Sequence, residues 1–331
     1  MRFCFYLSPW DRHEKSYGTA EYNNFFINQL TELLTNYGNV GEVWFDGANG
    51  EGPNGKKQEY DWDRYYATVR KYQPEALIAV TGPDIRWIGN EDGLGSETEW
   101  CTQPKKYKLQ IAGKNNLVWY PSECDVSIRP GWFYHSSEDQ QLKSAEQLID
   151  IYFKSVGRNS NLLLNIPPDQ NGLISEFDRS RLKEWREKLD EIFAKDIFYE
   201  QEIFASNYRD NKKYFSAQSC LDGNRNTFWT TDTNVTEAEL LINLNGRKQI
   251  NIIKLEEAIE YGQRIKSFEI HFNENGVFKK ICSGTTIGRS RIVAFNKIST
   301  DKIKIKITGS FAAPALRIIK GFYTDAVLQK F

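Results

Sequence analysis

Residues 42–52, EVWFDGANGEG, run from a short apolar segment into a glycine-rich loop, and a carboxylate, Asp46, stands at the junction. Side chains alternate along a strand, so Val43 and Phe45 share one face while Trp44 and Asp46 share the other. We expect the first face to pack beneath helices. The second face would then point into the mouth of a barrel formed by this strand and its neighbours.

The segments on both sides of this stretch alternate between apolar strands and amphipathic helices. Strands are expected at residues 2–7, 42–46, 76–81 and 161–166, and helices at 19–37, 61–73, 138–157 and 175–194. Such alternation indicates a parallel sheet covered by helices. We therefore predict an α/β fold over residues 1–197, a (β/α) TIM-like barrel.

Polar and aromatic residues follow the C-terminal ends of these strands, at Ser8 to Asp11, Asp46-Gly47, Gly82 to Asp84, Glu123 to Asp125 and Asn165. In a (β/α) barrel that rim carries the active site. A doubly wound open sheet would bind ligands at the same edge, but no G-x-G-x-x-G follows an early strand.

After residue 197 the pattern changes to short alternating segments separated by turn residues: ELLINL, NIIKLEEAI, SFEIHF, RIVAF and KIKIKI. This pattern is typical of an antiparallel β-sandwich, which we assign to residues 198–331. In KIKIKI, residues 302–307, the period of two directs lysines to water and isoleucines to the core.

The composition narrows the classes of function. The 331 residues have a formal net charge of -1, which predicts neither nucleic-acid binding nor a membrane surface, and no apolar run approaches a membrane span. Five widely spaced cysteines without a CxxC indicate neither a disulfide framework nor a structural zinc site. The first residues, MRFCFYLSPWD, lack the organisation of a signal peptide, so the compartment stays open. Aromatic residues make up 14%, and flat rings suit the faces of sugars as well as bulky cores.

Asp46, partly desolvated beside the Trp44 indole, suits a nucleophile that attacks a sugar carbon. The alternative is that its side chain only caps the next turn.

Several longer motifs carry a family resemblance. YLSPWDRHEKSYGTAEY, EVWFDGANGEGPNGKK, GPDIRWIGNEDG, VWYPSECDVSIRPGWFYH and NLLLNIPPDQNG, within residues 2–195, resemble the family 29 alpha-L-fucosidases, and most closely the subgroup that prefers alpha-1,3- and alpha-1,4-linked fucose. The resemblance implies a retaining exo-acting hydrolase without a cofactor, whose partners are fucosylated oligosaccharides or glycoconjugates. It implies that Asp46 is the nucleophile.

A retaining glycosidase needs a second carboxyl roughly 5–5.5 Å from the first, as general acid and then general base. The resemblance places this group at Glu91, in GNEDG, and Glu97 and Glu99 remain rivals within the same segment.

Six further residues are candidates for sugar binding, each with a structural alternative: Trp10, Trp44, Arg86, Glu123, Arg129 and Trp132. Trp44 resembles a platform for the fucose ring, with barrel packing as the alternative. Arg86 would hold a sugar hydroxyl or the acid/base, or else form an ion pair with Asp84. Glu123, Arg129 and Trp132 resemble residues that shape a subsite, with Trp132 stacking on the neighbouring galactose, and Trp10 is a wall of the same rim.

The chain departs from the family in one respect. Family members begin with further strand–helix units that supply a histidine pair, whereas His13, His135 and His271 form no such pair. We therefore expect an N-terminally incomplete barrel with exposed sheet edges, and little activity on an aryl fucoside.

Residues 198–324 resemble the discoidin-like, galactose-binding-like sandwich appended to these enzymes, on FASNYRDNKKYFSAQSCLDGNRNTFWTTD, EYGQRIKSFEIHF and TTIGRSRIVAF. Related modules hold calcium or a sugar at the loop that corresponds to LDGNRNTFW, where Asp222, Asn224, Asn226 and Thr227 carry hard oxygens. We prefer a hydrogen-bonded structural loop there and assign no metal. The rival to an enzyme is a non-catalytic glycan-binding protein that acts through this sandwich.

Overall fold

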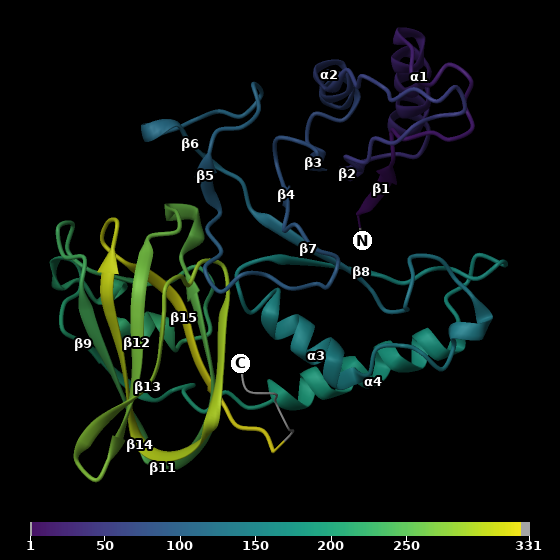
Figure 1. The fold of residues 1–331 in the computed structure, drawn as a ribbon. Coiled ribbons are helices and arrows are strands. Elements are labelled where there is room, and N and C mark those ends of the chain that lie inside the picture. The colour runs from purple at the N-terminus through teal and green to yellow at the C-terminus, as the bar shows by residue number, and fades with distance from the viewer. Residues whose placement is uncertain (1, 326–331) are drawn as a thin grey trace. The chain divides into compact units, whose positions relative to one another are not determined.

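The computed structural model describes residues 2–325, and the chain divides into two compact units. The first unit contains the residues up to Ile88 together with Thr102–Glu123, and the second contains Gly89–Cys101 and the residues from Cys124 onward. This division by compactness differs from the domain boundary predicted after residue 197, which stays a prediction. The predicted order, an α/β region followed by an all-β region, is confirmed (Figure 1).

The first unit is built on a parallel sheet with strand order β1-β2-β3 (Figure 1). Its strands are β1 (Phe3–Leu7), β2 (Val40–Phe45) and β3 (Leu77–Val80), and its helices are α1 (Ala20–Asn36) and α2 (Trp62–Tyr72). Short strands follow: β4 (Arg86–Trp87), β5 (Thr102–Pro104), β6 (Leu117–Trp119) and the start of β7 (Ser122–Ser127). β4 lies parallel to β7, and β5 lies antiparallel to β6.

The core of the first unit confirms which face of β2 is buried. Val43 and Phe45 are fully buried and pack with α1 and α2, where Phe45 meets the rings of Phe26 and Tyr65. Trp44 lies on the opposite face and is only partly buried. Burial of the first pair of side chains therefore fixes the direction in which the site-facing pair must point.

The second unit contains the rest of β7, which is followed in its sheet by β8 (Asn161–Asn165), and two helices, α3 (Ala145–Lys154) and α4 (Glu176–Ile192). The prediction of a helix over 138–157 was too long, because Ser144 and Gln147 form a capping box that sets the start of α3. The predicted apolar face of α4, which includes Trp185, packs against α3 and the sandwich.

The β-sandwich is antiparallel and has the strand order β10-β15-β11-β14-β12-β13, with β9 paired to β11. Its strands are β9 (Glu202–Ala205), β10 (Trp229–Thr230), β11 (Ala238–Glu257), β12 (Ile265–Glu274), β13 (Val277–Gly284), β14 (Arg291–Ser310) and β15 (Ala315–Phe322). The isoleucines of KIKIKI are buried in its core, as predicted from the period of two.

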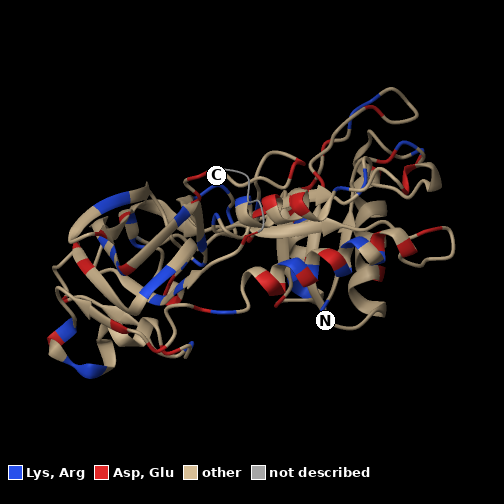
Figure 2. Ribbon diagram, turned by 90° about the horizontal axis from the view of Figure 1, so that it is seen from below, with Lys and Arg blue, Asp and Glu red and all other residues tan. Residues whose placement is uncertain are grey.

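Single 3-10 turns complete the described chain: η1 (Lys114–Asn116), η2 (Ser136–Glu138), η3 (Arg209–Asn211), η4 (Lys213–Phe215), η5 (Ala217–Cys220) and η6 (Ile259–Tyr261). Basic and acidic residues are interspersed along both units (Figure 2), in keeping with the net charge near zero. Within residues 2–325, no helix is both long and apolar enough to cross a bilayer.

A buried carboxyl in the sandwich gives a prediction on pH. Glu257 accepts hydrogen bonds from the backbone N–H groups of Arg264, Ile265 and Gly288, yet its burial raises its pKa from 4.5 to about 7. The folded chain therefore keeps a proton that the unfolded chain has lost. The free energy of unfolding should fall by about 3 kcal/mol as pH rises from 4.5 to about 7, and then stay level.

Chemical denaturation of Glu257→Gln across this range measures the contribution, because glutamine cannot titrate. We expect its unfolding free energy to decline less than that of the wild type. Glu202→Gln, at an exposed position in β9, should keep the wild-type slope. A Glu257→Gln curve parallel to the wild type would show that this carboxyl does not titrate between the two states.

Candidate active site

Asp46 follows the last residue of β2, and both of its carboxylate oxygens are held. Oδ1 accepts a hydrogen bond from the backbone N–H of Ala48 at 2.8 Å, which is the turn contact considered as the alternative to catalysis. Oδ2 accepts one from the hydroxyl of Tyr6 at 2.5 Å. The two contacts orient the carboxylate, so the turn and a role as nucleophile are compatible.

Tyr6 is a site residue that the sequence analysis missed. It lies on β1, and the parallel register pairs it with Trp44 of β2. The two rings lie 5.3 Å apart between centroids. The sequence did offer a signal, because Tyr6 lies near the end of the strand that comes before β2 in the chain. The register that aligns the two strands, however, cannot be deduced from residue spacing.

Glu123 joins this group from β7. The Trp44 indole Nε1 donates to Glu123 Oε1 at 2.9 Å, and Glu123 is 2% exposed. Glu42 lies on the same face of β2 as Trp44, and its pKa is raised to about 7, first by burial and then by the negative charge of Glu123. The first unit therefore brings together Asp46, Trp44 and Glu123.

Trp10 packs against the glycine-rich loop that follows Asp46. Its indole Nε1 donates to the Glu51 carbonyl at 3.2 Å, and its ring lies directly against Gly50. A Cβ at Gly50 would lie 2.1 Å from the Trp10 ring, and one at Gly52 would lie 2.3 Å from the Tyr17 ring. The glycines are required because two aromatic rings pack against the bare backbone.

Arg86, on β4, donates from Nε to the Tyr120 carbonyl at 3.3 Å. Asp84, considered as its ion-pair partner, forms an ion pair with Arg70 and also accepts a hydrogen bond from the Ile78 backbone N–H at 2.7 Å. Asp84 is therefore engaged in holding α2 to β3.

Glu91 and Trp132 meet within the second unit. The Trp132 indole Nε1 donates to Glu91 Oε2 at 3.1 Å, and the Trp132 carbonyl accepts from the side-chain amide of Asn165 at 3.0 Å. These contacts bring one predicted carboxyl to one predicted sugar platform. Asp46 belongs to the first unit and Glu91 to the second.

The two rivals of Glu91 have different surroundings. Glu99 is 4% exposed, and its carboxylate accepts hydrogen bonds from the N–H and hydroxyl of Ser96. The Glu97 side chain is 76% exposed and lies 3.8 Å from Arg158. Glu91 is exposed as well, but its contact with Trp132 distinguishes it from both rivals, and its role as the acid/base stays a prediction.

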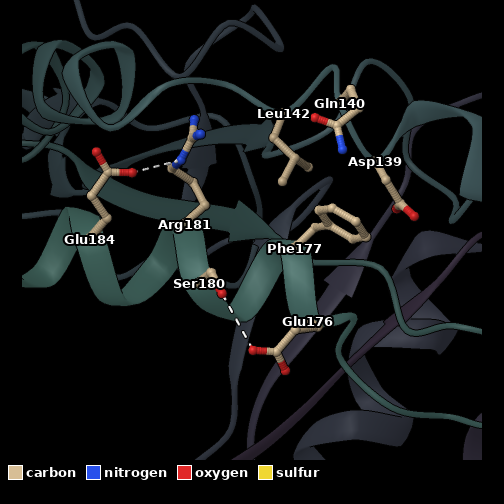
Figure 3. A pocket seen from close by; sticks show the side chains of 8 residues that line it. All are labelled: Asp139, Gln140, Leu142, Glu176, Phe177, Ser180, Arg181 and Glu184. Carbon is tan, nitrogen blue, oxygen red and sulfur yellow. Dashed lines mark hydrogen bonds and ion pairs between the residues drawn. The ribbon is translucent and has the colours of Figure 1, made fainter.

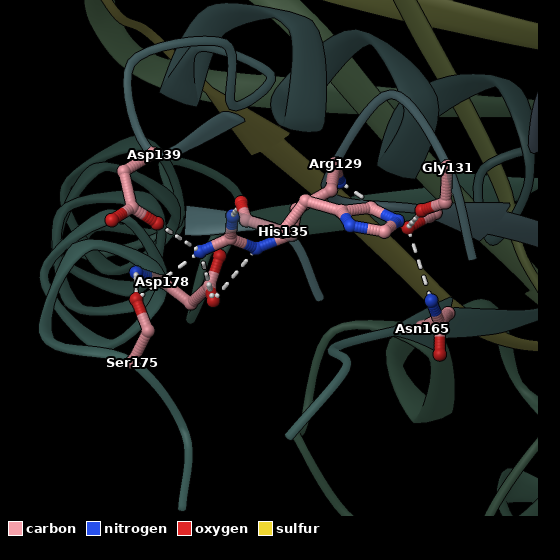
Figure 4. Close-up of polar contacts among 8 residues, drawn as sticks. Arg129, Gly131, His135, Asp139, Asn165, Ser175 and Asp178 are labelled. Carbon is pink, nitrogen blue, oxygen red and sulfur yellow. Dashed lines mark hydrogen bonds and ion pairs between the residues drawn. The ribbon is translucent and has the colours of Figure 1, made fainter. Parts of the chain in front are cut away.

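Arg129 does not line a surface, and this corrects the prediction that it shapes a sugar subsite. Its side chain is 0% exposed. Its guanidinium donates to Asp178, Asp139, Ser175 and the His135 carbonyl, as Figure 4 shows. These bonds tie the segment after β7 to the start of α4, because the guanidinium can donate in several directions at once.

In the loop LDGNRNTFW, side-chain oxygens accept hydrogen bonds from other residues of the same loop. Asp222 accepts from the Asn224 backbone N–H and from the Thr227 hydroxyl, both at 2.8 Å, and Asn224 Oδ1 accepts from the Asn226 backbone N–H at 2.9 Å. These hydrogen bonds hold the loop together, and the preference for a structural loop over a calcium site stays a prediction.

Two pockets in the second unit lie outside the predicted site. One, of about 320 Å³, lies between the first turns of α4 and residues 139–142, and is lined by Phe177, Arg181 and Glu184 among others (Figure 3). The other, of about 380 Å³, lies between residues 134–137 and 169–171. No predicted site residue lines either pocket.

Comparisons with known proteins give two family matches along the chain. The family described as "Alpha-L-fucosidase" matches residues 1–190, and the F5/8 type C domain matches residues 202–318. Alpha-L-fucosidase 1 of Arabidopsis thaliana is 39% identical over 337 residues, which cover 97% of this chain and 65% of that protein. The chain therefore spans less than two thirds of that relative.

Solved structures of fucosidases are also similar to this chain. A Ruminococcus gnavus GH29 fucosidase in complex with fucose aligns with a TM-score of 0.89 and 28% identity, over 100% of this chain and 74% of that chain. A glycoside hydrolase 29 family member from an unknown rumen bacterium aligns with a TM-score of 0.81 and 32% identity, over 99% of this chain and 59% of that chain.

The buried position of Arg129 gives a prediction on stability. Arg129→Lys should lower the free energy of unfolding by about 3 kcal/mol, because the three donors of a single ammonium nitrogen cannot replace the five hydrogen bonds that the guanidinium makes from three nitrogens. Urea denaturation measures the loss. The matched control is Arg179→Lys, an exposed ion pair with Glu176 whose replacement should change stability by less than about 0.5 kcal/mol. Equal values for the two variants would contradict a structural role for Arg129.

Proposed function

The chain belongs to the glycoside hydrolase family 29 alpha-L-fucosidases, and from this membership we propose that it is a retaining exo-alpha-L-fucosidase. Its substrates are oligosaccharides or glycoconjugates with terminal alpha-linked fucose. The observation that carries the proposal is Asp46, a carboxylate held at a strand end by the Ala48 N–H and the Tyr6 hydroxyl, beside the Trp44 ring.

In the first step, the Asp46 carboxylate attacks the anomeric carbon of fucose. The glycosidic bond breaks as Glu91 gives its proton to the leaving oxygen, and the sugar becomes an ester of Asp46. In the second step, Glu91 takes a proton from water, and the oxygen of that water attacks the same carbon. Fucose leaves, and Asp46 returns to its carboxylate form.

The neighbouring side chains divide between the two sides of the bond. Trp44 offers a ring for the fucose, and its hydrogen bond to the buried Glu123 fixes the orientation of that ring. Trp132, bound to Glu91, offers an aromatic face to the leaving sugar. We assign Trp10 to the wall of the site and Arg86 to holding a sugar hydroxyl or the acid/base. A preference for alpha-1,3 and alpha-1,4 linkages follows from the subgroup that the sequence resembles.

Covalent trapping tests the nucleophile. A 2-deoxy-2-fluoro fucoside with a good leaving group should add one fluorofucosyl group to the peptide that contains Asp46, because the fluorine slows release of the ester. Mass spectrometry of the digested chain locates the label. Asp46→Asn should take up no label, whereas Asp63→Asn, an exposed aspartate that pairs with Lys108, should label as the wild type does. Label on another peptide would transfer the role of nucleophile away from Asp46.

The same trapping experiment separates the enzyme from a glycan-binding protein. A chain that takes up no label but binds fucosylated oligosaccharides through residues 198–331 alone would support the non-catalytic alternative. That alternative rests on the F5/8 type C match and on no contact within the candidate site.

Tyr6→Phe tests how the nucleophile is oriented. Loss of the hydroxyl removes the 2.5 Å hydrogen bond to Asp46 and should lower kcat/KM by about 10- to 100-fold, as expected for a hydrogen bond to a charged group. Initial rates on an aryl fucoside measure the effect. The control is Tyr37→Phe, at an exposed position just after α1, which should keep the wild-type rate. Equal rates for the two variants would remove Tyr6 from the site.

A further inference from the structure

The segment Gly89–Cys101 carries Glu91 and belongs to the second unit, although the residues on both sides of it belong to the first. The first half of this segment is held near α3. The Gly95 N–H donates to the Lys154 carbonyl at 2.8 Å, and Arg158 donates to the Gly95 carbonyl at 2.9 Å. Gly93 lies so close to Val126 that a Cβ there would come within 2.8 Å of its side chain.

The second half of the segment is held by the β-sandwich. Thr98 and Thr285 share a hydrogen bond between their hydroxyls at 2.6 Å, and Arg291 of β14 donates to the Glu97 carbonyl at 2.6 Å. The rings of Trp100 and Phe311 meet edge to face at 5.4 Å between centroids. Contacts of three kinds, hydroxyl, guanidinium and aromatic, therefore join this segment to loops and strands of the sandwich.

Gln263, between η6 and β12, binds the backbone of this segment with both polar atoms of its side-chain amide. Its Oε1 accepts from the Cys101 N–H at 2.8 Å, and its Nε2 donates to the Glu99 carbonyl at 3.0 Å. Asn159 donates to the same two acceptors, the Glu99 carbonyl at 2.9 Å and Gln263 Oε1 at 3.3 Å. Gln263 is 6% exposed, so its removal would take away a buried hydrogen bond to the Cys101 N–H, while the Glu99 carbonyl would keep its bond from Asn159.

We propose that the β-sandwich, chiefly through Gln263, positions the segment that carries the acid/base Glu91. The sandwich would then take part in fucoside hydrolysis, because it would set the position of the Glu91 carboxyl relative to the leaving oxygen. A general acid must lie within hydrogen-bond reach of the atom it protonates, and a displacement of about 1 Å can cost about 100-fold in rate. The inference rests on the proposed function, because it takes Glu91 as the acid/base.

The test uses the dependence of the rate on the leaving group. A 2,4-dinitrophenyl fucoside leaves without help from an acid, whereas a phenyl fucoside needs its oxygen protonated. Gln263→Ala should therefore lower kcat/KM for the phenyl fucoside by about 10-fold or more and for the dinitrophenyl fucoside by less than about 3-fold. A merely structural loss would lower both rates alike.

A matched variant controls for the loss of a buried amide. Asn251 is 9% exposed and makes the same kind of contact in the sandwich: its side chain accepts from the Thr324 N–H at 3.1 Å and donates to the Thr324 carbonyl at 2.7 Å. Asn251→Ala should lose similar stability but show no selective effect on the phenyl fucoside. If Gln263→Ala lowers both rates equally, as Asn251→Ala would, the proposal is wrong.

Two further measurements separate this proposal from the proposed function. Glu91→Gln must itself show the selective loss on the phenyl fucoside, and its absence would count against Glu91 as the acid rather than against Gln263. Amide hydrogen exchange at Cys101 needs no turnover: Gln263→Ala should speed it by about 10-fold or more, and Asn251→Ala should not. Unchanged exchange at Cys101 in Gln263→Ala would overturn the proposal even for a chain that hydrolyses no fucoside.

Discussion

The parallel register of β1 on β2 is the constraint on which the candidate site depends. Tyr6 pairs with Trp44, so the phenol of one strand reaches the carboxylate just beyond the end of the next. A slip by one residue would turn Tyr6 to the opposite face, because side chains alternate along a strand. The register is fixed from the other side of the sheet, where Val43 and Phe45 fill the core beneath α1 and α2. Packing on one face thus sets the chemistry on the other.

Aromatic rings and buried carboxyls occupy the site-facing side at a cost in stability. Glu42 and Glu123 place two acids in a region largely withdrawn from water, which is why the pKa of Glu42 rises. The Trp44 indole donates one hydrogen bond to Glu123, and the Trp10 ring lies directly against Gly50. A core designed for stability alone would bury apolar groups here, so these polar groups are more easily understood as parts of a site.

Sequence periodicity predicted most of the helices and strands, because an element that buries one face has apolar residues at regular intervals along the sequence. The strands and helices of the first unit and the isoleucines of KIKIKI follow from it. Contacts between residues far apart in the sequence could not be predicted in this way. Arg129, for example, is buried against Asp178, which lies 49 positions later in the chain. The roles of Asp46 and Glu91 came from resemblance, since spacing alone left Asp46 as either a turn cap or a nucleophile. Tyr6 was missed because strand register is a tertiary property.

Family boundaries and physical boundaries divide this chain differently. The two family matches meet between residues 190 and 202, yet the segment with Glu91 is compact with the sandwich. Removing the sandwich at the family boundary would strip partners from the Cys101 N–H and the Glu97 carbonyl, and water would have to replace them. A segment that keeps only its contacts near α3 has fewer constraints and more accessible conformations, each with a different position for the carboxyl. In the proposed arrangement, the sandwich contributes to the rate of the reaction through the segment that it holds, without touching the reacting atoms.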